Sequence, residues 1–498
     1  MTLKLDAEQE RDILRIANEP SLAALDASTM SAGKTVVALA VAKRRGAKVI
    51  LVCGPLQTRG GWAATAQNGW EWSNGAYEDY ADLPFRWIRN SKGGVKARAL
   101  FMMNTPGIYF IGHEYAVAIS WKLSHYRKLL DEDGRPKVDK VTGKPKLRKV
   151  MEYNVICDRV APHMLIVDEI HRGNINADNM RYKTLDKIDS YFMLGLSGTP
   201  HGNRFDGIYP VSKMLWPNYV DDTMQRFKRR WCEHEYDPHS WDHMKVTGEL
   251  VEGAYFKWLP CVVRREWEYE GVLDSQGVYV ELSSEQRKAY GDLENSMVTW
   301  LEDHPFVIEF PQTLRIRLRQ ATLAMFYEDT DGVVQFRENA RSTKLGALYQ
   351  VLENDFQGEP AIVMTDSRKF AEISVARLNK KYGTVAELWS GHQTQIGRDK
   401  IKARFMAHET KYVVMVIKAG GTGTDGLQFG SHNIAIMSMD DSRIENEQAI
   451  ARTVRRGQGP LVRLRYIMAI DTYDEGILHG QLAAKVRMRK SMDLTGAG

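Results

Sequence analysis

Ser28–Thr35 reads STMSAGKT, and it is followed by VVALAVAKRRG (36–46) and by the apolar run KVILVC at Lys48–Cys53. The spacing of the middle part predicts a helix that ends at Gly46. A Gly-Lys-Thr triplet that opens such a helix is typical of a triphosphate site, because backbone N–H groups and the positive helix end attract phosphates. Gly33 lets the backbone come close, Lys34 can reach the β- and γ-phosphates, and the Thr35 hydroxyl can hold Mg²⁺. The pattern G-x-x-x-x-G-K-[ST] is incomplete, since Ser28 stands where the first glycine belongs.

A second motif supports the same chemistry. Met164–His171 reads MLIVDEIH, an apolar strand that ends in Asp-Glu. At the carboxyl end of that strand, Asp168 would hold Mg²⁺ through water, and Glu169 would orient and deprotonate the attacking water. A plain strand followed by a solvated turn explains neither the Asp-Glu-x-His sequence nor its presence beside Gly-Lys-Thr. Together the two motifs predict hydrolysis of a nucleoside triphosphate.

The fold class follows from short apolar runs that alternate with helical patterns. The first half has such runs at Lys48–Cys53, Ile108–Ile111, Met164–Val167 and Tyr191–Leu196, and the second half at Ala361–Met364, Tyr412–Ile417, Asn433–Met437 and Val462–Met468. Short runs between helices indicate βαβ units around a parallel sheet that is buried on both faces. We therefore predict an α/β protein with two α/β domains.

Other segments fit this scheme less directly. The region 204–350 is rich in aromatic and charged residues, and Ser284–Leu301 and Gln312–Phe326 have helical periodicity. Tyr126–Lys149 is polar and basic with turn signals, which predicts a long hairpin or surface loop, either a solvated insertion or a phosphate contact.

Composition sets the broad class. The chain has 498 residues, of which 43% are apolar and 26% charged, and this excludes a mainly disordered chain, a collagen-like fibre and a small disulfide scaffold. No apolar stretch approaches the ~18 residues that span a bilayer, and the N-terminus lacks signal-peptide features, so we expect no membrane partner. The four cysteines show no C-x-x-C spacing, which favours a reducing, cytoplasmic environment. The 68 basic and 63 acidic residues nearly cancel, so a nucleic-acid footprint would have to come from local patches.

The first-half motifs, taken in order, resemble those of helicase superfamily two and specifically its Swi/Snf-type branch. STMSAGKT resembles that branch's DEMGLGKT, with Met30 matched and Ser31 in place of a glycine. VCGPLQTRGGW (Val52–Trp62) is similar to its motif Ia, and DEIHRGN (Asp168–Asn174) to DEAHRxKN, the DEAH-box. LSGTPHGNR (Leu196–Arg204) resembles LTGTPxxNN, the motif that links the ATP state to the grip on nucleic acid.

The second half matches in order as well. WSGHQTQIGRDKIKARF (389–405) is similar to a GxxxxxxRxxxixxF segment, KAGGTGTDGLQ (418–428) resembles motif V, and QAIARTVRRGQ (448–458) resembles motif VI. By this resemblance Arg452 and Arg455 are the arginines that reach the γ-phosphate, where such a charge is worth ~10³–10⁵ in rate. FKRRWCEHEY (227–236), VVRREWEYEGVL (262–273), YVELSSEQRKAY (279–290) and RSTKLGAL (341–348) resemble the annealing-helicase-like subgroup, and the small size suggests a minimal bacterial or phage form.

The resemblance implies two RecA-like P-loop domains with parallel sheets and helical insertions: lobe 1 at 1–275 with an insertion at about 204–260, and lobe 2 at 276–498 with one at about 283–340. It also implies roles for single residues. The expected nucleotide-binding residues are Gln9, Met30, Ser31, Ala32, Gly33, Lys34, Thr35, Gly423 and Asp425, and Thr35 and Asp168 are expected to hold Mg²⁺. The expected nucleic-acid contacts are Thr58, Arg59, His113, Gly420 and Gly421, and the coupling residues are Ser197, Gly198, Thr199 and Gln448.

We therefore expect a monomeric motor that hydrolyses ATP between two lobes and moves along duplex or forked DNA without sequence preference, in a bacterial or phage-infected host cytosol. Three alternatives stay open: a motor subunit of a restriction or defence complex, an RNA helicase, and a nucleotide-dependent DNA clamp that does not hydrolyse ATP.

Two groups of residues allow either a structural or a functional interpretation. Cys232, His234, His239 and His243 match no standard zinc spacing, so surface or packed histidines are favoured over a metal site. The aromatic group Trp70, Trp72, Tyr77, Tyr80, Phe85 and Trp87 could stack on bases, but core packing is favoured.

Overall fold

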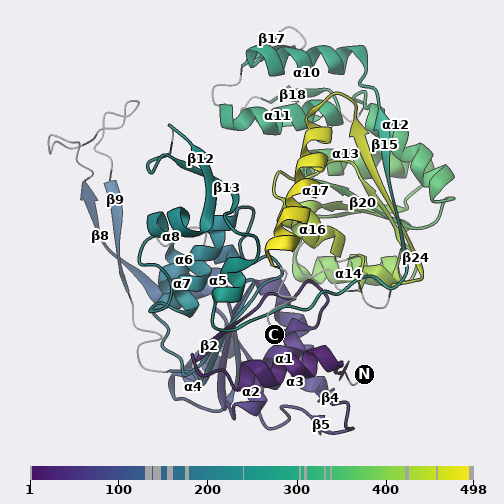
Figure 1. Cartoon of the computed structure of the whole chain (residues 1–498). Helices are drawn as coiled ribbons and strands as arrows, with labels where there is room; N and C mark the ends of the chain where they lie inside the picture. The colour runs from purple at the N-terminus through teal and green to yellow at the C-terminus, as the bar shows by residue number, and fades with distance from the viewer. Residues whose placement is uncertain are drawn as a thin grey trace. The chain divides into compact units, whose positions relative to one another are not determined.

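The computed structural model describes the chain except for residues 1–2, 129–136, 138–146, 154–160, 174–178, 239, 302–303, 308–310, 330–332, 337–338, 421–425, 452, 456–457 and 493–498. The chain forms two compact units, Met1–Glu266 with Ser491–Gly498, and Trp267–Lys490 (Figure 1). Each unit contains one large parallel sheet with helices, so the predicted α/β class is confirmed.

The sheet of the first unit has seven parallel strands in the order β14-β2-β11-β10-β3-β7-β6. Their bounds are β2 Ala23–Asp26, β3 Val49–Gly54, β6 Phe85–Ile88, β7 Gly107–Gly112, β10 Met164–Asp168, β11 Met193–Leu196 and β14 Val262–Val263. The four strands predicted in this half are confirmed as β3, β7, β10 and β11. Strands β2, β6 and β14 were not predicted, because β14 has only two residues and the four-residue strands β2 and β6 contain at most one β-branched residue each.

The register of this sheet aligns the carboxyl ends of its central strands. Asp26 pairs with Leu196, and Leu196 pairs with Asp168. One strand further along, Cys53 pairs with Val167, and Gly54 pairs with Gly112. Because all of these strands are parallel, the loops that follow them leave the sheet at one edge, where open α/β sheets bind ligands.

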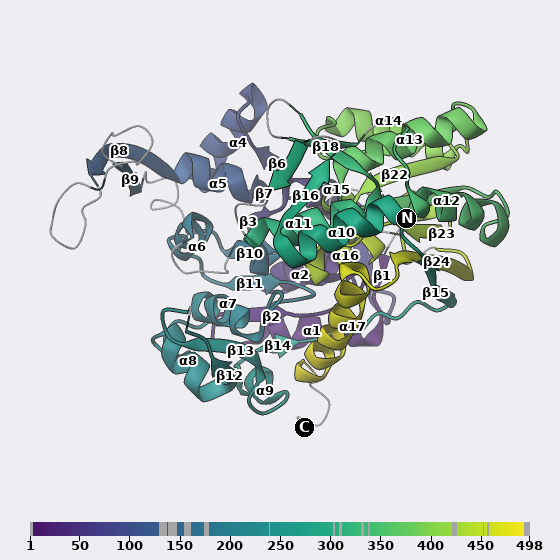
Figure 2. The same cartoon turned by 90° about the horizontal axis from the view of Figure 1, so that it is seen from above.

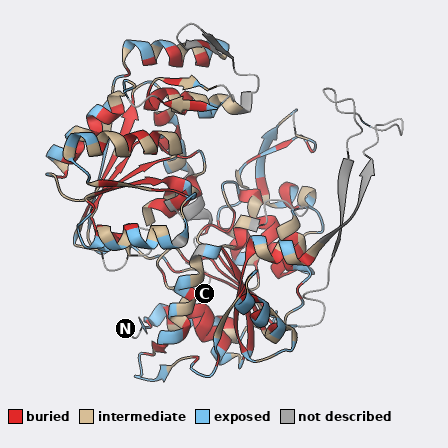
Figure 3. Cartoon of the chain, turned by 180° about the vertical axis from the view of Figure 1, so that it is seen from behind, coloured by how far each residue is buried: buried red, intermediate tan, exposed pale blue. Residues whose placement is uncertain are grey.

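Helices cover the sheet and leave its strands buried, as the red strands in Figure 3 show. The helices of this unit are α1 Ala7–Ala17, α2 Lys34–Arg44, α3 Arg59–Asn68, α4 Lys92–Met102, α5 His113–Ser120, α6 Met180–Asp186, α7 Ile208–Leu215, α8 Met224–Trp231 and α9 Ala254–Trp258. Helix α2 is buried without interruption from Val36 to Ala42, which explains why its sequence is apolar on all sides.

The smaller strands of the first unit lie outside the main sheet. They are β1 Leu3–Lys4, β4 Trp70–Glu71 and β5 Tyr77–Glu78 in one small sheet, the hairpin β8 Trp121–Lys128 and β9 Leu147–Tyr153, and the hairpin β12 Cys232–Tyr236 and β13 Met244–Glu249. The hairpin predicted around Tyr126–Lys149 is thus confirmed as β8–β9, and most of its connection lies outside the described residues.

The second unit has six parallel strands in the order β15-β24-β23-β20-β22-β21. Their bounds are β15 Val272–Val280, β20 Ala361–Thr365, β21 Ala386–Trp389, β22 Tyr412–Val416, β23 Asn433–Ile436 and β24 Leu461–Ala469. The four predicted strands are confirmed as β20, β22, β23 and β24, although β22 ends one residue early because Ile417 starts a helix.

The helices of the second unit are α10 Ser284–Ser296, α11 Pro311–Leu323, α12 Thr343–Gln350, α13 Arg368–Tyr382, α14 Gln395–Met406, α15 Ile417–Gly420, α16 Arg443–Ala451 and α17 Tyr473–Ser491. The two helices expected at 284–301 and 312–326 are present but shorter. Each is followed by a small hairpin, β16 Val298–Leu301 with β17 His304–Val307, and β18 Phe326–Glu328 with β19 Val334–Phe336. No helix in the described part of the chain is both long and apolar enough to cross a membrane.

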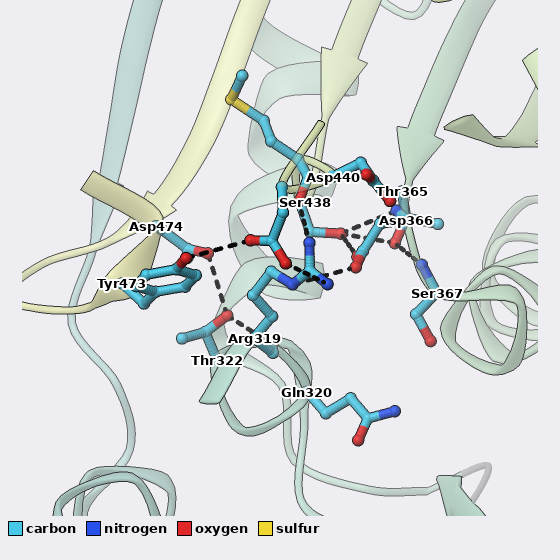
Figure 4. A network of polar contacts seen from close by, with 12 residues as sticks. Arg319, Gln320, Thr322, Thr365, Asp366, Ser367, Ser438, Asp440, Tyr473 and Asp474 are labelled. Carbon is cyan, nitrogen blue, oxygen red and sulfur yellow. Dashed lines mark hydrogen bonds and ion pairs between the residues drawn. The ribbon is translucent and has the colours of Figure 1, made fainter. Parts of the chain in front are cut away.

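A buried polar network joins helix α11 to the carboxyl ends of β20 and β23 (Figure 4). The Arg319 guanidinium donates to the Met439 carbonyl at 3.1 Å and lies 3.4 Å from carboxylate oxygens of both Asp366 and Asp441. Burial raises the pKa of Asp366, and the positive charge of Arg319 offsets this shift only in part. Since a buried charge is tolerated only with partners, this arginine fastens the insertion that carries α10 and α11 to the sheet.

Lys344 makes a second buried contact in this network. Its side chain is fully buried, and its ammonium donates to the Met437 carbonyl at 2.7 Å and lies 2.5 Å from the Asp474 carboxylate. The Thr322 hydroxyl and the Ala469 N–H also donate to Asp474, at 3.4 Å and 3.2 Å. The ion pair therefore ties the start of α12 to the start of α17.

We expect Lys344→Met to lower the free energy of unfolding by about 3–5 kcal/mol, because it leaves a buried carboxylate without its cation. Urea denaturation followed by circular dichroism measures this loss. The double variant Lys344→Met with Asp474→Asn should lose less, since both charges are removed. Equal urea midpoints for the wild type and Lys344→Met would contradict the assignment.

Candidate nucleotide-binding site

The loop between β2 and α2 has the backbone of a phosphate cradle. Gly33 is the N-cap of α2 with φ +80°, and Ser31 has φ +65°, a left-handed conformation that residues with a Cβ seldom adopt. The motif that this loop resembles has a glycine at the position of Ser31, and the structure keeps glycine-like geometry there in spite of the side chain. Strain of this kind collects at binding sites, where the surrounding structure holds it in place.

Lys34 is held against this loop. Its ammonium donates to the carbonyls of Ser28 and Thr29 at 2.8 Å and 2.9 Å. Burial lowers the pKa of Lys34, and the nearby carboxylates of Glu169, Asp26 and Asp168 counteract it. The ammonium thus lies in a site where the negative charge of a phosphate would stabilise it.

Asp168 lies at the end of β10 and is held by motif Ia. The Trp62 indole N–H donates to Asp168 Oδ2 at 3.0 Å, and a methyl at Gly54 would come within 3.0 Å of the Asp168 Cβ. Burial raises the pKa of Asp168 and the charge of Glu169 raises it further, whereas the Trp62 and Thr58 hydrogen bonds lower it. Two adjacent carboxylates in such a place fit a divalent cation, for which the Thr35 hydroxyl is a further oxygen donor of the kind Mg²⁺ accepts.

Glu169 is strained and short of partners. Its backbone is left-handed, with φ +50°, and its Oε2 is buried without a hydrogen bond. His171 Nδ1 lies 3.4 Å from that oxygen and 2.6 Å from Ser197 Oγ. Burial lowers the pKa of His171 to about 3, so the ring is neutral at physiological pH and does not neutralise the carboxylate. An oxygen that accepts no hydrogen bond from the described residues can accept one from water, as a group that binds and activates water must.

The predicted coupling residues of motif III lie beside the loop. Ser197 Oγ also accepts the Thr199 N–H at 3.0 Å, and a methyl at Gly198 would lie 3.8 Å from the Lys34 ammonium. Motif III therefore contacts both the Gly-Lys-Thr loop and, through His171, the Asp-Glu motif.

Gln9 lies on the loop as well. Its Oε1 accepts the Asp6 N–H at 3.0 Å in a capping box of α1, and its Nε2 donates to the Ala32 carbonyl at 3.2 Å. A methyl at Gly33 would meet Gln9 Nε2 at 2.3 Å, so only glycine allows this contact.

The role of Arg265 was not predicted from the sequence. The residue follows β14, and its buried guanidinium lies 2.6 Å from Asp12 Oδ2 and 2.8 Å from Asp26 Oδ2. Its backbone N–H donates to Ser28 Oγ at 3.0 Å, and its carbonyl accepts the Thr29 N–H at 2.9 Å. Burial alone would lower the pKa of Arg265, but Asp26 and Asp12 raise it. Arg265 thus holds the Gly-Lys-Thr loop through its ion pairs and its backbone hydrogen bonds. In the sequence, only the pair of arginines in VVRREWEYEGVL could have indicated this role.

The nucleic-acid candidates of the first unit lie at the same edge of the sheet. Thr58 donates its hydroxyl to the Pro55 carbonyl at 3.0 Å, and the Arg59 guanidinium lies 4.4 Å from the centre of the Trp87 ring. His113 is buried, with Nε2 2.9 Å from the Asp168 carbonyl and Nδ1 3.4 Å from Cys53 Sγ. Burial lowers the pKa of His113. Its ring therefore faces the Asp-Glu motif rather than solvent, which is a place for a positioning residue and not for a direct phosphate contact.

The candidates of the second unit are described only in part. Gly420 ends α15, Gln448 is buried in α16, and Arg455 follows that helix and is partly buried. Gly421, Gly423, Asp425 and Arg452 lie outside the described residues.

The two ambiguous groups differ in how far they are buried, and Phe85 and Trp87 of the aromatic group are only partly buried. No metal-binding cluster of histidine, cysteine or carboxylate residues occurs in the described ranges, and His239 lies outside them. Trp70, Trp72 and Tyr80 are buried in the core, whereas Tyr77 is half exposed. The described cysteines Cys53, Cys232 and Cys261 are buried free thiols.

Comparison with known proteins agrees with this geometry. Residues 343–457 match the helicase conserved C-terminal domain. An uncharacterised ATP-dependent helicase of Mycoplasma genitalium is 24% identical over 333 residues, which are 66% of this chain and 31% of that protein. A putative ATP-dependent helicase/translocase of Bacillus subtilis is 22% identical over 315 residues, 61% of this chain and 32% of that protein. The chain thus spans about a third of the length of these relatives.

Among solved structures, the Sulfolobus solfataricus SWI2/SNF2 ATPase core in complex with dsDNA aligns with 100% of this chain and 94% of its own, at 15% identity and a TM-score of 0.39.

The helicase C-terminal match lies in the second unit, and the Gly-Lys-Thr and Asp-Glu motifs lie in the first. The chain is therefore similar to ATP-dependent helicases, and its second unit carries a match to the helicase C-terminal domain. Its motifs resemble those of superfamily two and of the Swi/Snf-type branch, and its place in that branch and in a subgroup of it stays a prediction.

We expect Arg265→Met to lower the free energy of unfolding by about 3–5 kcal/mol, because two buried carboxylates lose their shared cation. Arg265→Lys keeps the charge but cannot donate to both carboxylates, so it should destabilise less and still weaken ADP binding about tenfold or more. Calorimetric titration with ADP and urea denaturation measure the two effects. Unchanged ADP affinity in Arg265→Lys would show that the residue only stabilises the fold.

Proposed function

We propose that this chain is an ATP-driven motor that moves along duplex or forked DNA, as a monomer in the cytosol, with functional lobes at 1–275 and 276–498. The observation that carries the proposal is the buried, unpaired Glu169 oxygen beside Asp168 at the edge of the sheet where Lys34 lies. A carboxylate with a purely structural role would normally accept hydrogen bonds from the protein. This one is kept ready for a ligand.

Lys34 and the loop bind the triphosphate. The ammonium now donates to two loop carbonyls, and the phosphate oxygens are stronger acceptors that carry charge. Thr35 and Asp168 would hold Mg²⁺, which neutralises charge on the β- and γ-phosphates when it is bound. Gln9, which contacts Ala32 and Gly33 from α1, reads the adenine.

Glu169 orients the attacking water and accepts its proton. Neutral His171 keeps the carboxylate free of a competing positive charge and connects it to Ser197 of motif III. Arg452 and Arg455 stabilise the negative charge that builds up on the transferred phosphoryl group, and Gly423 and Asp425 complete the nucleotide contacts. Loss of the γ-phosphate then removes contacts that favour one of two conformations with different grip on the nucleic acid.

Trp62 offers a route by which nucleic acid and nucleotide affect each other. The helix α3 begins at Arg59, next to Thr58, and it carries the indole that holds the Asp168 carboxylate. A phosphate bound at the start of α3 would therefore shift the same helix that orients the cation ligand. Thr58, Arg59, Gly420 and Gly421 contact the backbone, and Gln448 belongs to the coupling path. Recognition through phosphates is independent of sequence and sensitive to salt.

We expect Glu169→Gln to lower kcat for ATP hydrolysis by ~10²–10⁴-fold, because an amide cannot accept the proton of water. The affinity for ATP should stay close to that of the wild type, while Lys34→Ala should lose both binding and turnover. Steady-state ATPase rates and binding of a fluorescent ATP analogue measure these effects. Turnover of Glu169→Gln near the wild-type rate would exclude Glu169 as the base.

We expect duplex or forked DNA to raise the ATPase rate several-fold, at least as strongly as single-stranded DNA. A panel of single-stranded, duplex, forked and four-way DNA together with RNA tests the substrate class, with the Glu169→Gln protein as the zero-turnover control. Stimulation by RNA alone would assign the chain to the RNA helicases. Nucleotide binding without any turnover would identify a clamp, and activity that needs a second subunit would indicate a defence complex.

A further inference from the structure

A surface at the end of the first sheet is strongly basic. Between Asp82 and Glu114 the sequence has five lysine and arginine residues and no acidic residue. These residues belong to β6, to the turn that follows it and to α4, which packs on β6 (Figure 2). The side chains of Arg89, Lys92 and Lys96 are exposed.

The positive charges on this surface are not neutralised. No carboxylate of the described residues forms an ion pair with Arg59, Arg89, Lys92, Lys96 or Arg98. Arg86 is used inside the fold, because its guanidinium donates to the Pro106 carbonyl and to the Tyr109 hydroxyl at 2.9 Å and 3.4 Å. Unpaired like charges repel one another, so their retention at one place favours an anionic partner.

Trp87 organises the surface. The guanidinium of Arg89 lies 3.9 Å from the centre of its ring, and that of Arg59 lies 4.4 Å from it. One indole therefore positions an arginine of α3 beside an arginine of the β6–α4 turn. An arginine that lies against a ring can keep its N–H groups free to donate in the plane of its own guanidinium, which is a geometry that phosphate oxygens accept.

The shape of the turn is fixed by the backbone. Ser91 caps α4 by accepting the Gly94 N–H, and a methyl at Gly94 would meet the Arg89 carbonyl at 2.3 Å. Trp87, Arg89, Gly94 and Lys96 line an open hollow of about 440 Å³. The basic residues therefore line a concave surface and are not scattered over the protein.

Its place in the sheet connects it to the site already described. Strand β6 pairs in parallel with β7, and β7 with β3, so the turn after β6 leaves the sheet at the edge where the loop after β3 begins. That loop leads to Arg59. The basic surface therefore continues the proposed nucleic-acid contact of motif Ia along the same edge.

We infer that Arg89, Lys92 and Lys96, organised with Arg59 around Trp87, bind the phosphodiester backbone of a duplex beyond the segment that motif Ia contacts. This inference rests on the proposed function. The surface would lengthen the footprint of the first unit on its track and would add to affinity without reading bases.

The test compares two triple variants of the full chain. In the first, Arg89, Lys92 and Lys96 are changed to alanine. In the control, Arg226, Lys245 and Lys369 are changed to alanine, which removes the same charge at positions where each cation already faces a carboxylate. Fluorescence anisotropy with a labelled DNA duplex of about 30 base pairs, and an RNA duplex of equal length, gives Kd between about 50 and 200 mM salt.

We expect the first variant to bind the DNA duplex about tenfold or more weakly, with a salt slope less negative by about 2–3, and the control to change less than about twofold. A charge-conserving variant, Arg89→Lys with Lys92→Arg and Lys96→Arg, should keep most of the affinity, and thermal unfolding checks that each protein is folded. If the wild type binds and the first variant has the same affinity and slope, this surface is not a binding surface. If only the RNA duplex depends on it, the DNA track is wrong. If the wild type binds neither duplex, the proposed function fails as well.

Discussion

The parallel hydrogen-bonded register of β2, β11, β10, β3 and β7 is the constraint on which the site depends. It aligns Asp26, Leu196 and Asp168 at the ends of neighbouring strands, and the same alignment continues to Gly54 and Gly112. Residues that lie far apart in the sequence thereby leave the sheet at one edge. A shift of one residue in any of these strands would turn its side chains to the opposite face and separate the motifs.

The buried charges described in the two units divide into two kinds. Arg265 with Asp12 and Asp26, and Lys344 with Asp474 in the second unit, are paired groups that hold elements together. Asp168 and Glu169 are two adjacent carboxylates whose mutual repulsion is offset only in part by Lys34 and by the hydrogen bonds to Asp168. In the first unit, the ion pairs of Arg265 hold the elements that flank the Gly-Lys-Thr loop, and the two adjacent carboxylates would gain stabilisation from a bound cation and nucleotide.

Hydrogen bonds also make the motifs interdependent. Trp62 of motif Ia donates to Asp168, His113 lies against the carbonyl of the same residue, and His171 lies between Glu169 and Ser197. Motifs that are separate in the sequence therefore contact one another through these side chains. This explains why His113, which resemblance suggested as a nucleic-acid contact, has a buried ring that faces inward.

The sequence alone predicted the buried strands and the phosphate-binding motif. A strand that is buried on both faces needs a continuous apolar run, and a phosphate loop needs glycine and lysine at the start of a helix. The eight predicted strands and the roles proposed for Lys34, Asp168 and Glu169 rest on such local requirements. Strands β2, β6 and β14, the support of the loop by Arg265 and the contact of Arg59 with Trp87 depend on partners from 23 to more than 230 residues away along the chain. Only tertiary structure decides such pairings, because a short strand or a lone arginine has no pattern of its own until packing and hydrogen bonding give it a neighbour.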